Sequence, residues 1–273
     1  MTRILAASAA EFRIALRNRW VAIAVLMMAL FAAVLSAAGS APTGALGADK
    51  LSVTVASLTS LAVYLVPLIA LLMSFDAIAG EVERGTLPLI LTYPVARWQL
   101  LAGKFAAHVG ILGLAVTVGY GIAAAAAFRT DARAAEGLPA LVRLGWTSLL
   151  LGAAFLGVGS AVSAAARRPG AAAGLVIGLW LVLIVLYDLG LLAAVVADGG
   201  GTFTRAVFPW LLLANPADAF RLYNLAASEA TAAAAGIGGA ANSVPPGQAL
   251  AALLLWAAGA FALAVAAFRR VTP

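Results

Sequence analysis

The chain consists mainly of long apolar runs separated by short polar segments. Six runs are long enough to cross about 30 Å of hydrocarbon, which takes roughly 20 mostly apolar helical residues. They cover residues 20–38, 53–74, 105–128, 144–165, 171–196 and 248–268. The runs are continuously apolar and lack the alternation of polar and apolar positions that is typical of a membrane β-barrel strand. The pattern therefore predicts an all-α polytopic membrane protein with six transmembrane helices in a single domain.

The segment before the first run, residues 3–19, has two different faces in a helical projection. The apolar face carries Leu5, Ala9, Phe12, Leu16 and Trp20, and the opposite side carries Arg3, Glu11, Arg13 and Arg17. A helix with this pattern lies in the plane of the membrane interface. The alternative is the first part of a cleaved signal peptide, with the small residues 36–38 near the cleavage point. The apolar run exceeds the roughly 7–15 residues of a typical signal-peptide core, which favours an interfacial helix.

The distribution of positive charges predicts the orientation of the spans, because Lys and Arg are more frequent in cytoplasmic loops. With the N-terminus inside, 11 of the 17 Lys and Arg residues lie on the inner side. Two of the outer ones, Arg205 and Arg221, fall in the longest loop, where the bias is weakest. Both termini are therefore expected in the cytoplasm. This orientation places residues 75–104 inside and residues 197–247 outside.

Composition excludes a soluble protein. The chain is 64% hydrophobic and 10% charged, with a mean hydropathy of +1.05, whereas a soluble domain carries about 25% charged residues. The net charge of +6 is spread over the ends of the apolar runs, which fits anionic lipid headgroups rather than nucleic acid. Cysteine is absent, so a disulfide and a thiolate metal site are both excluded.

No metal site is expected within the chain. His108 is the only histidine, so a histidine pair cannot form, and a packing or hydrogen-bonding role is favoured. Met27, Met28 and Met73 could offer thioether sulfur to Cu(I). Met27 and Met28 are adjacent and point to different helix faces, which favours ordinary contacts with the core or with lipid.

The densest group of charged residues lies between the second and third runs, in residues 75–105. It comprises Asp76, Glu81, Glu83, Arg84, Arg97 and Lys104. Such a loop predicts a docking surface for a cytosolic partner. Gly103 and Lys104 resemble the end of a phosphate-binding loop, but that motif needs glycine at Trp98 and Ser or Thr at Phe105. The chain is therefore not expected to be an enzyme, and any ATP must be hydrolysed by another chain.

Residues 197–247 form a second candidate docking surface, on the outer side. Within them, Asn215-Pro216 is typical of a helix start. Shortly before this segment, Asp188 interrupts an apolar run. A carboxylate inside a membrane is costly and by default marks a pathway, a partner or a proton site. The alternative is a structural hydrogen bond to Tyr187 or Tyr64, and the sequence leaves both interpretations open.

Two sets of small residues are spaced for close helix packing. Gly170, Gly174 and Gly178 form GxxxGxxxG at the start of the fifth span. The fourth span carries a ridge of Ala153, Gly157, Ala161 and Ala165. Small residues at four-residue spacing let helices approach closely. They predict either packing within the chain or a seam between two copies.

Several motifs resemble those of the ABC-2 type membrane subunits of ABC transporters. They are ERGTL at 83–87, LTYPVAR at 91–97 and GK at 103–104. Further similar strings are LRNRW at 16–20, FDAI at 75–78, LYDL at 186–189 and PWLLLANP at 209–216. These strings are spread over most of the chain, and together they resemble the membrane subunits that serve nitrous oxide reductase maturation.

This resemblance implies a six-helix permease fold of the type V exporter kind in a bacterial inner membrane. It implies a homodimer, two cytoplasmic ATPase subunits that bind ATP and magnesium, and a periplasmic β-helical partner, with no cofactor in this chain. The implied ATPase-coupling residues are Asp76, Glu81, Glu83, Arg84 and Arg97. The implied contacts of the periplasmic partner are Trp210, Asp218, Phe220, Arg221 and Tyr223.

The implied function is to couple ATP hydrolysis to copper-site maturation of nitrous oxide reductase. The permease would either pass a small solute, such as a sulfur species, or drive a conformational change in the periplasmic partner. The alternatives are another ABC-2 exporter permease, an ATP-independent secondary transporter and a passive membrane scaffold. Secondary transporters usually show broken spans and several polar midplane residues, of which only Asp188 is found.

Overall fold

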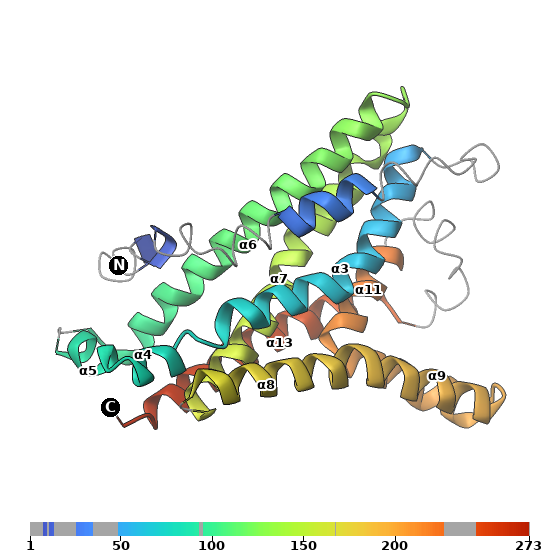
Figure 1. The fold of residues 1–273 in the computed structure, drawn as a ribbon. Coiled ribbons are helices and arrows are strands. Elements are labelled where there is room, and N and C mark those ends of the chain that lie inside the picture. Colours follow the sequence, from blue (N-terminus) through green and yellow to red (C-terminus); the bar gives the residue numbers. More distant parts are fainter. Residues whose placement is uncertain are drawn as a thin grey trace.

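The computed structural model describes residues 8–9, 11–13, 26–34, 49–92, 95–166, 168–226 and 244–272. Within these ranges the chain is helical apart from short turns and contains no strand, which confirms the predicted all-α fold (Figure 1). The elements, in order, are α3 (Lys50–Ser74), α4 (Ala79–Glu83), α5 (Thr86–Leu91), α6 (Arg97–Phe128), η2 (Ala134–Gly137), α7 (Leu138–Ala166), α8 (Pro169–Trp180), η3 (Leu181–Leu186), α9 (Tyr187–Asp198), η4 (Phe203–Val207), α10 (Phe208–Ala214), α11 (Pro216–Ala226) and α13 (Pro246–Arg269).

Five continuous helices in the described ranges are long and apolar enough to cross a membrane. They are Lys50–Glu83, Arg97–Phe128, Ala134–Ala166, Pro169–Asp198 and Pro246–Arg269, and each contains one of the last five predicted runs. Of the first predicted run, only residues 26–34 are described, and they are helical. Six spans therefore stay a prediction, and most of the predicted interfacial helix 3–19 lies outside the described residues.

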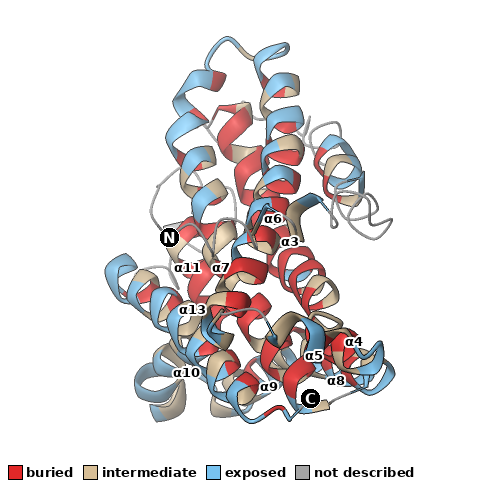
Figure 2. Ribbon diagram, turned by 90° about the vertical axis from the view of Figure 1, so that its left-hand side faces the viewer, coloured by how far each residue is buried: buried red, intermediate tan, exposed pale blue. Residues whose placement is uncertain are grey.

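α7 lies at the centre of the bundle. It packs along α3 and α13 and also contacts α6, α8 and α11, and buried residues follow much of its length (Figure 2). At its crossing with α13, Gly157 leaves no room for a side chain. A Cβ added there would lie 2.7 Å from the backbone carbonyl carbon of Ala260. This part of the small-residue ridge therefore serves packing within the chain.

The helix formed by α8, η3 and α9 lies along the outside of the bundle (Figure 1). Only 17% of its most apolar window is buried within the chain, against 67% for Lys50–Glu83. Gly170, Gly174 and Gly178 are exposed, and a Cβ added at any of them would meet nothing within 4 Å. Their common face is thus open in the described part of the chain.

Part of the predicted outer loop folds back into the bundle as the α10–α11 hairpin. α11 packs against α3, α7 and α13, and Phe220 is fully buried. At the turn between the two helices, Asn215 Nδ2 donates to the carbonyl oxygen of Leu183 at 2.6 Å, and Trp256 Nε1 donates to that of Ala214 at 3.2 Å. Leu183 precedes the end of α9 by about 15 residues, roughly 22 Å of helix rise. The turn therefore lies near the middle of the spans and not at their ends.

The carbonyl group that Asn215 uses belongs to a π-helical segment. η3 is π-helical, and such segments interrupt the regular backbone hydrogen bonds of an α-helix. Asn215, with 2% of its surface exposed, supplies a donor to this altered backbone from another helix pair. The irregular stretch of the fifth span and the turn of the hairpin therefore stabilise one another.

The two ends of the bundle differ in their polar contacts. At the end where α3 begins and α9 ends, called the α9 end below, the Asp131 carboxylate accepts a hydrogen bond from the backbone N–H of Lys50 at 2.8 Å. This bond and a second from the Arg133 N–H hold the pKa of Asp131 below its usual value. Asp49 caps α3 by accepting from the Ser52 N–H at 2.9 Å. The opposite end carries α4, α5 and the C-terminus (Figure 1).

Candidate functional site

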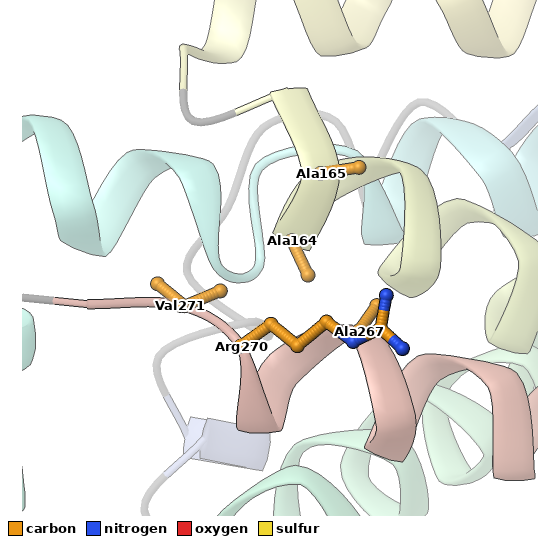
Figure 3. A pocket seen from close by; sticks show the side chains of 5 residues that line it. All are labelled: Ala164, Ala165, Ala267, Arg270 and Val271. Carbon is orange, nitrogen blue, oxygen red and sulfur yellow. The ribbon is translucent and has the colours of Figure 1, made fainter.

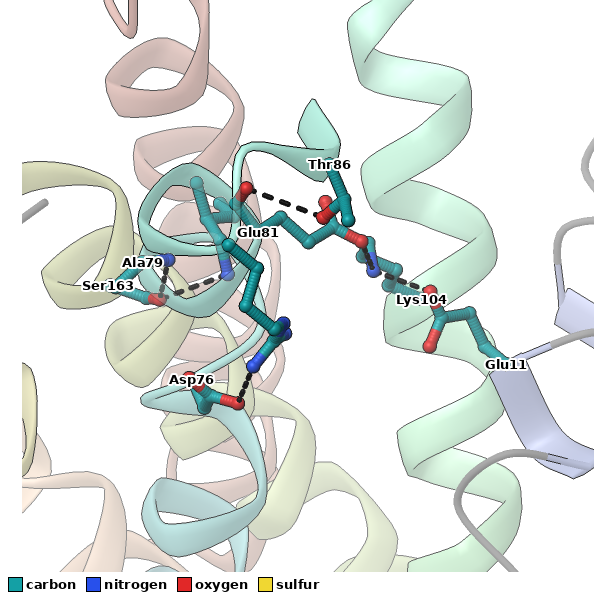
Figure 4. A network of polar contacts seen from close by, with 9 residues as sticks. Glu11, Asp76, Ala79, Glu81, Thr86, Lys104 and Ser163 are labelled. Atoms are coloured by element: carbon teal, nitrogen blue, oxygen red, sulfur yellow. Dashed lines mark hydrogen bonds and ion pairs between the residues drawn. The ribbon is translucent and has the colours of Figure 1, made fainter. Parts of the chain in front are cut away.

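The candidate site is the α4–α5 segment, residues 76–92, at the end of the bundle opposite the α9 end. α4 starts on a side chain of α7: the backbone N–H groups of Ile78 and Ala79 donate to Ser163 Oγ at 3.0 and 2.9 Å (Figure 4). The first N–H groups of a helix have no partner within that helix, so the hydroxyl satisfies two of them. Because Ser163 is fully buried, this cap fixes the start of α4 against α7.

A buried lysine fixes the other side of α4. Lys104 of α6 has 5% of its surface exposed, and its Nζ lies 2.6 Å from Glu81 Oε1. The same ammonium group pairs with Glu11 of the N-terminal segment (Figure 4). The second oxygen of Glu81, Oε2, is buried and has no hydrogen-bond partner. One cation thus joins three segments, and the Glu81 carboxylate, predicted to contact a partner, faces inward.

The N-terminal contact also changes how the amphipathic segment is understood. Phe12 packs near Ile111 and lies 3.4 Å from the position that a Cβ on Gly110 would take. Its neighbour Glu11, assigned to the polar face, reaches Lys104 on the same helix α6. Both faces of this stretch therefore contribute contacts to α6.

Asp76 and Arg84 form an ion pair on the surface of the same segment. Arg84 Nη1 lies 3.2 Å from Asp76 Oδ2, and both side chains are largely exposed. A Cβ on Gly80 would lie 2.1 Å from Asp76 Oδ1, so glycine lets this carboxylate approach α4. Gly85 adopts φ of 67°, a left-handed conformation that favours glycine, and it separates α4 from α5.

The α4–α5 segment has an exposed tip and a buried base that packs against the bundle. Leu87 and Ile78 are buried in a cluster with residues of α6, α7 and α13. In contrast, Glu83 and Pro88 are exposed, and Leu89 has 65% of its surface exposed. Pro88 and Leu89 are adjacent and give the segment a small apolar surface beside the exposed Glu83. The base is the part that packing holds in place.

Arg97, also predicted to contact a partner, holds the C-terminus instead. Its Nη1 donates to the carbonyl oxygens of Phe268 at 3.0 Å and Arg269 at 3.4 Å, and also to that of Val271. Its guanidinium carbon lies 5.8 Å from the centre of the Phe268 ring. The last carbonyl groups of a helix lack intrahelical partners, and a basic side chain satisfies them well. Arg97 therefore ties the start of α6 to the end of α13.

A small hollow of about 210 Å³ opens beside this contact (Figure 3). It is lined by Ala164, Ala165, Ala267, Arg270 and Val271. Arg270 is the only charged residue of this lining. Within the described ranges, no group of three or more His, Asp or Glu residues is placed to hold a metal ion. Met28 is buried in the core, and Met27 and Met73 pack against that core.

At the other candidate surface, the predicted contact residues fall into two groups. Trp210 is 68% exposed, whereas Asp218 and Phe220 are buried. Tyr223 packs edge-on against Trp146, with ring centroids 5.7 Å apart. Arg221 Nη1 lies 3.1 Å from Asp218 Oδ1. Of these five residues, only Trp210 presents most of its side chain at the surface.

Asp188 pairs with Arg221, at 2.9 Å between Oδ2 and Nη2. The suggested hydrogen bond from Asp188 to Tyr187 or Tyr64 is not the one in the structure. The Tyr187 hydroxyl donates instead to the Leu211 carbonyl oxygen at 2.7 Å. The neighbouring Asp218, on α11, pairs with the same arginine.

Sequence reasoning did not predict the contacts that Lys104, Glu11 and Ser163 make. The signal for Lys104 was weak, because this residue directly precedes the predicted run 105–128 and was counted with the cytoplasmic loop. The sequence does not identify the partners of Lys104: Glu11 is 93 residues away and Glu81 is 23 residues away. Ser163 gave no signal, since a lone serine in an apolar helix usually bonds to its own backbone.

A bundle of long apolar helices with a short charged segment at one end defines a polytopic membrane protein. The chain belongs to the ABC-2 transporter family: the model for ABC-2 family transporter proteins matches residues 5–272. It is therefore the membrane component, or permease subunit, of an ABC transporter. The resemblance noted from the motifs is confirmed.

Two relatives are similar over nearly their whole length. The chain is 47% identical over 259 residues to the probable ABC transporter permease protein NosY of Pseudomonas aeruginosa, covering 93% of this chain and 94% of that protein. It is 43% identical over 264 residues to the protein of the same name from Stutzerimonas stutzeri, with the same two coverages.

Proposed function

We propose that this permease couples ATP hydrolysis by a separate cytoplasmic ATPase subunit to work on the far side of the membrane. The α4–α5 segment is the part that the ATPase contacts. The observation that carries this proposal is the exposed tip of the segment on its buried base, with Leu89 exposed and Leu87 fully buried. A partner that binds the tip moves a base that is packed on α6, α7 and α13.

The predicted coupling residues divide into two roles in this proposal. Asp76, Glu83 and Arg84 contact the ATPase directly, because their side chains reach the surface. Glu81 and Arg97 act by positioning, since they bind Lys104 and the carbonyl groups at the end of α13. ATP and magnesium are bound by the partner, and this chain carries no cofactor.

The functional unit in this proposal is a homodimer with two NosF-like ATPase subunits. The open face of α8 supplies the seam between the two copies. In support, Gly170, Gly174 and Gly178 share that face and have nothing within 4 Å of an added Cβ. Close approach of two helices along such glycines is a common mode of association in membranes.

The names of the two relatives support a particular assembly. We propose that the chain is a NosY-type subunit in a bacterial inner membrane, surrounded by lipid and with both termini cytoplasmic. It serves copper-site maturation of nitrous oxide reductase during denitrification. A periplasmic NosD-like β-helical protein binds at the α9 end of the bundle. The buried Asp218 and Phe220, together with Arg221 and Tyr223, shape the hairpin that carries Trp210.

In this proposal, ATP hydrolysis drives a conformational change in the periplasmic partner. Three hollows at described residues are small, about 210, 280 and 320 Å³. The tight contact of Gly157 with the backbone of Ala260 makes α7 and α13 move together. A second candidate function is the passage of a small solute, such as a sulfur species. The hollow of about 320 Å³ between α9, α10 and α11 supports this candidate.

The test of docking is a double charge reversal, Glu83→Lys with Arg84→Glu. The tagged permease is purified from native membranes, and the ATPase that accompanies it is measured. We expect at least about a tenfold loss of ATPase, because like charges placed opposite one another cost several kcal/mol at an interface. Immunoblotting of the membrane fraction checks that the variant still inserts.

A matched control reverses two exposed charges at the α9 end, Arg129→Glu with Glu136→Lys. It should retain the ATPase fully. Equal ATPase recovery from both double variants would remove the α4–α5 tip from the docking surface. If the unaltered permease brings down no ATPase, the permease acts as an ATP-independent transporter or a scaffold, and the coupling proposal is wrong.

A further inference from the structure

Three charged side chains meet in the hollow of about 320 Å³ between α9, α10 and α11. They are Asp188, Asp218 and Arg221, and the remaining wall is apolar. The side chains of Asp188 and Arg221 are 27% and 30% exposed, so both reach the hollow. The side chain of Asp218 is only 2% exposed.

The three groups do not balance in charge. The guanidinium of Arg221 donates through Nη2 to Asp188 at 2.9 Å and through Nη1 to Asp218 at 3.1 Å. One cation therefore serves two carboxylates. The second oxygen of Asp218, Oδ2, is buried and has no hydrogen-bond partner. If both carboxylates are ionised, one negative charge stays uncompensated, which is strongly unfavourable away from water.

We propose that Asp218 Oδ2 binds a proton, and that Asp188, Asp218 and Arg221 form a proton-binding site between the middle of the bundle and its α9 end. The proton comes from water in the hollow and brings the sum of the three charges to zero. It also turns the unpartnered oxygen into a hydrogen-bond donor. Two carboxylates that share one site commonly hold one proton, because like charges at short range disfavour double ionisation. Ionisable groups at membrane depth often form proton sites.

A metal cation fits this hollow less well than a proton does. The guanidinium lies between the two carboxylates and repels a cation that would bind there. Hard cations such as Ca²⁺ take six or more oxygen ligands, and the charged part of this lining offers two carboxylates only. A proton needs a single oxygen atom, which Asp218 Oδ2 supplies.

Other charged and titratable groups near Asp218 come from several packed elements. Arg221 on α11 itself and Asp188 and Tyr187 on α9 act on Asp218 directly. Tyr64 on α3 acts on Arg221, and Arg143 on α7 donates to the Asn224 carbonyl oxygen of α11. α10 has no titratable side chain, and the only one on α13 is Arg269 at its far end. Asp188 is the only other acid of this group, so it is the residue that raises the proton affinity of Asp218.

Proton occupancy has a mechanical consequence. Asp188 belongs to α9 and Asp218 to α11, so loss of the proton places two like charges across the contact between the fifth span and the α10–α11 hairpin. Bound proton therefore holds the hairpin on α9, and proton release loosens it. This inference rests on this chain alone and does not depend on ATPase docking.

The experiment is infrared difference spectroscopy of the full chain in lipid nanodiscs between about pH 5 and about pH 9, a range in which ordinary carboxyls are already ionised. We expect the wild type to show a protonated carboxyl band that disappears as the pH rises. The band should be lost in Asp218→Asn. In Asp188→Asn it should be absent at neutral pH, because Asp218 then has Arg221 to itself and stays ionised. The second variant decides the question if the first does not fold.

The matched control is Asp198→Asn, at the end of α9 and outside the hollow, and it should keep the band. A Glu81→Gln variant identifies any protonated carboxyl band that comes from Glu81, the partner of Lys104. Persistence of the band in both Asp218→Asn and Asp188→Asn would overturn the proposal. So would loss of the wild-type band on adding sodium chloride at fixed pH, because the hollow would then bind a monovalent cation.

Discussion

At the residue scale, Lys104 shows how a charge is retained inside an apolar bundle. Its ammonium group is almost fully buried and has carboxylates from two other segments, Glu81 and Glu11, as partners. A buried ion pair adds little net stability over an apolar replacement, but removing one partner leaves a buried charge alone. The cluster therefore specifies the position of α4 more than it stabilises the fold.

Replacing Lys104 with Met should therefore destabilise the protein strongly. The variant leaves Glu81 buried without its cation, and loss of one partner of such a pair costs about 3–5 kcal/mol. The measurement is thermal unfolding of the purified chain in detergent. Adding Glu81→Gln to Lys104→Met should restore part of the loss, since the unpaired charge is then gone.

The control for this prediction is Arg84→Gln, which breaks the exposed pair with Asp76. Exposed pairs contribute about 0–1 kcal/mol, so unfolding should change little. A Lys104→Met variant as stable as Arg84→Gln would show that the ammonium group is not needed to neutralise Glu81.

The contrast between Glu81 and Glu83 marks how far sequence reasoning reaches at this scale. Both are acids in one charged loop, and both were assigned to docking. The structure turns Glu81 inward to Lys104 and leaves Glu83 exposed. Which acid faces inward depends on the rotation of α4, and Ser163 on another helix sets that rotation. Such a long-range contact leaves no local pattern.

At the scale of elements, the long apolar runs predicted the spans well. They did not predict that the α10–α11 hairpin packs inside the bundle. Run length reports the distance a helix can cross, and the five described spans agree with it. α10 has 7 residues and α11 has 11, which is too short to cross. Their polar groups find partners on other helices, such as Asn224 with Thr147, 77 positions away. From the sequence alone, a short helix pair whose partners are distant in the chain is therefore predicted as an outer loop.

The α7–α13 crossing gives a prediction about packing. Gly157→Leu should destabilise the protein by about 3 kcal/mol, the upper end of typical overpacking effects, because the new side chain meets the backbone of Ala260 and not a flexible side chain. Gly259→Leu on α13 is the control, since a Cβ there meets nothing within 4 Å. Chemical unfolding in detergent compares the two, and equal midpoints would contradict the close crossing.

At the scale of the whole molecule, burial is uneven around the bundle. α7 is surrounded by other helices, whereas the fifth span has a largely free surface (Figure 2). Lipid can cover such a surface, and so can a second copy. The glycine face of α8 favours the second copy, because glycines gain most from close helix contact.

Cross-linking tests that arrangement, and the absence of cysteine in the chain makes the test clean. A single Gly174→Cys substitution should give a disulfide-linked dimer in native membranes, because a disulfide forms when the two Cα atoms lie within about 7 Å. Gly259→Cys, at an equally open glycine on α13, should stay monomeric on a denaturing gel. The reverse result would place the seam on α13.

The Arg97 contact has a consequence for the order in which the protein is assembled. It joins residues 171 positions apart, so the carbonyl groups it binds are synthesised long after Arg97. Until α13 is inserted, the start of α6 has one anchor fewer, and the neighbouring α4–α5 segment lacks part of its base. A nascent or truncated chain that lacks α13 therefore does not present the finished surface, so the docking segment is complete only once α13 has packed.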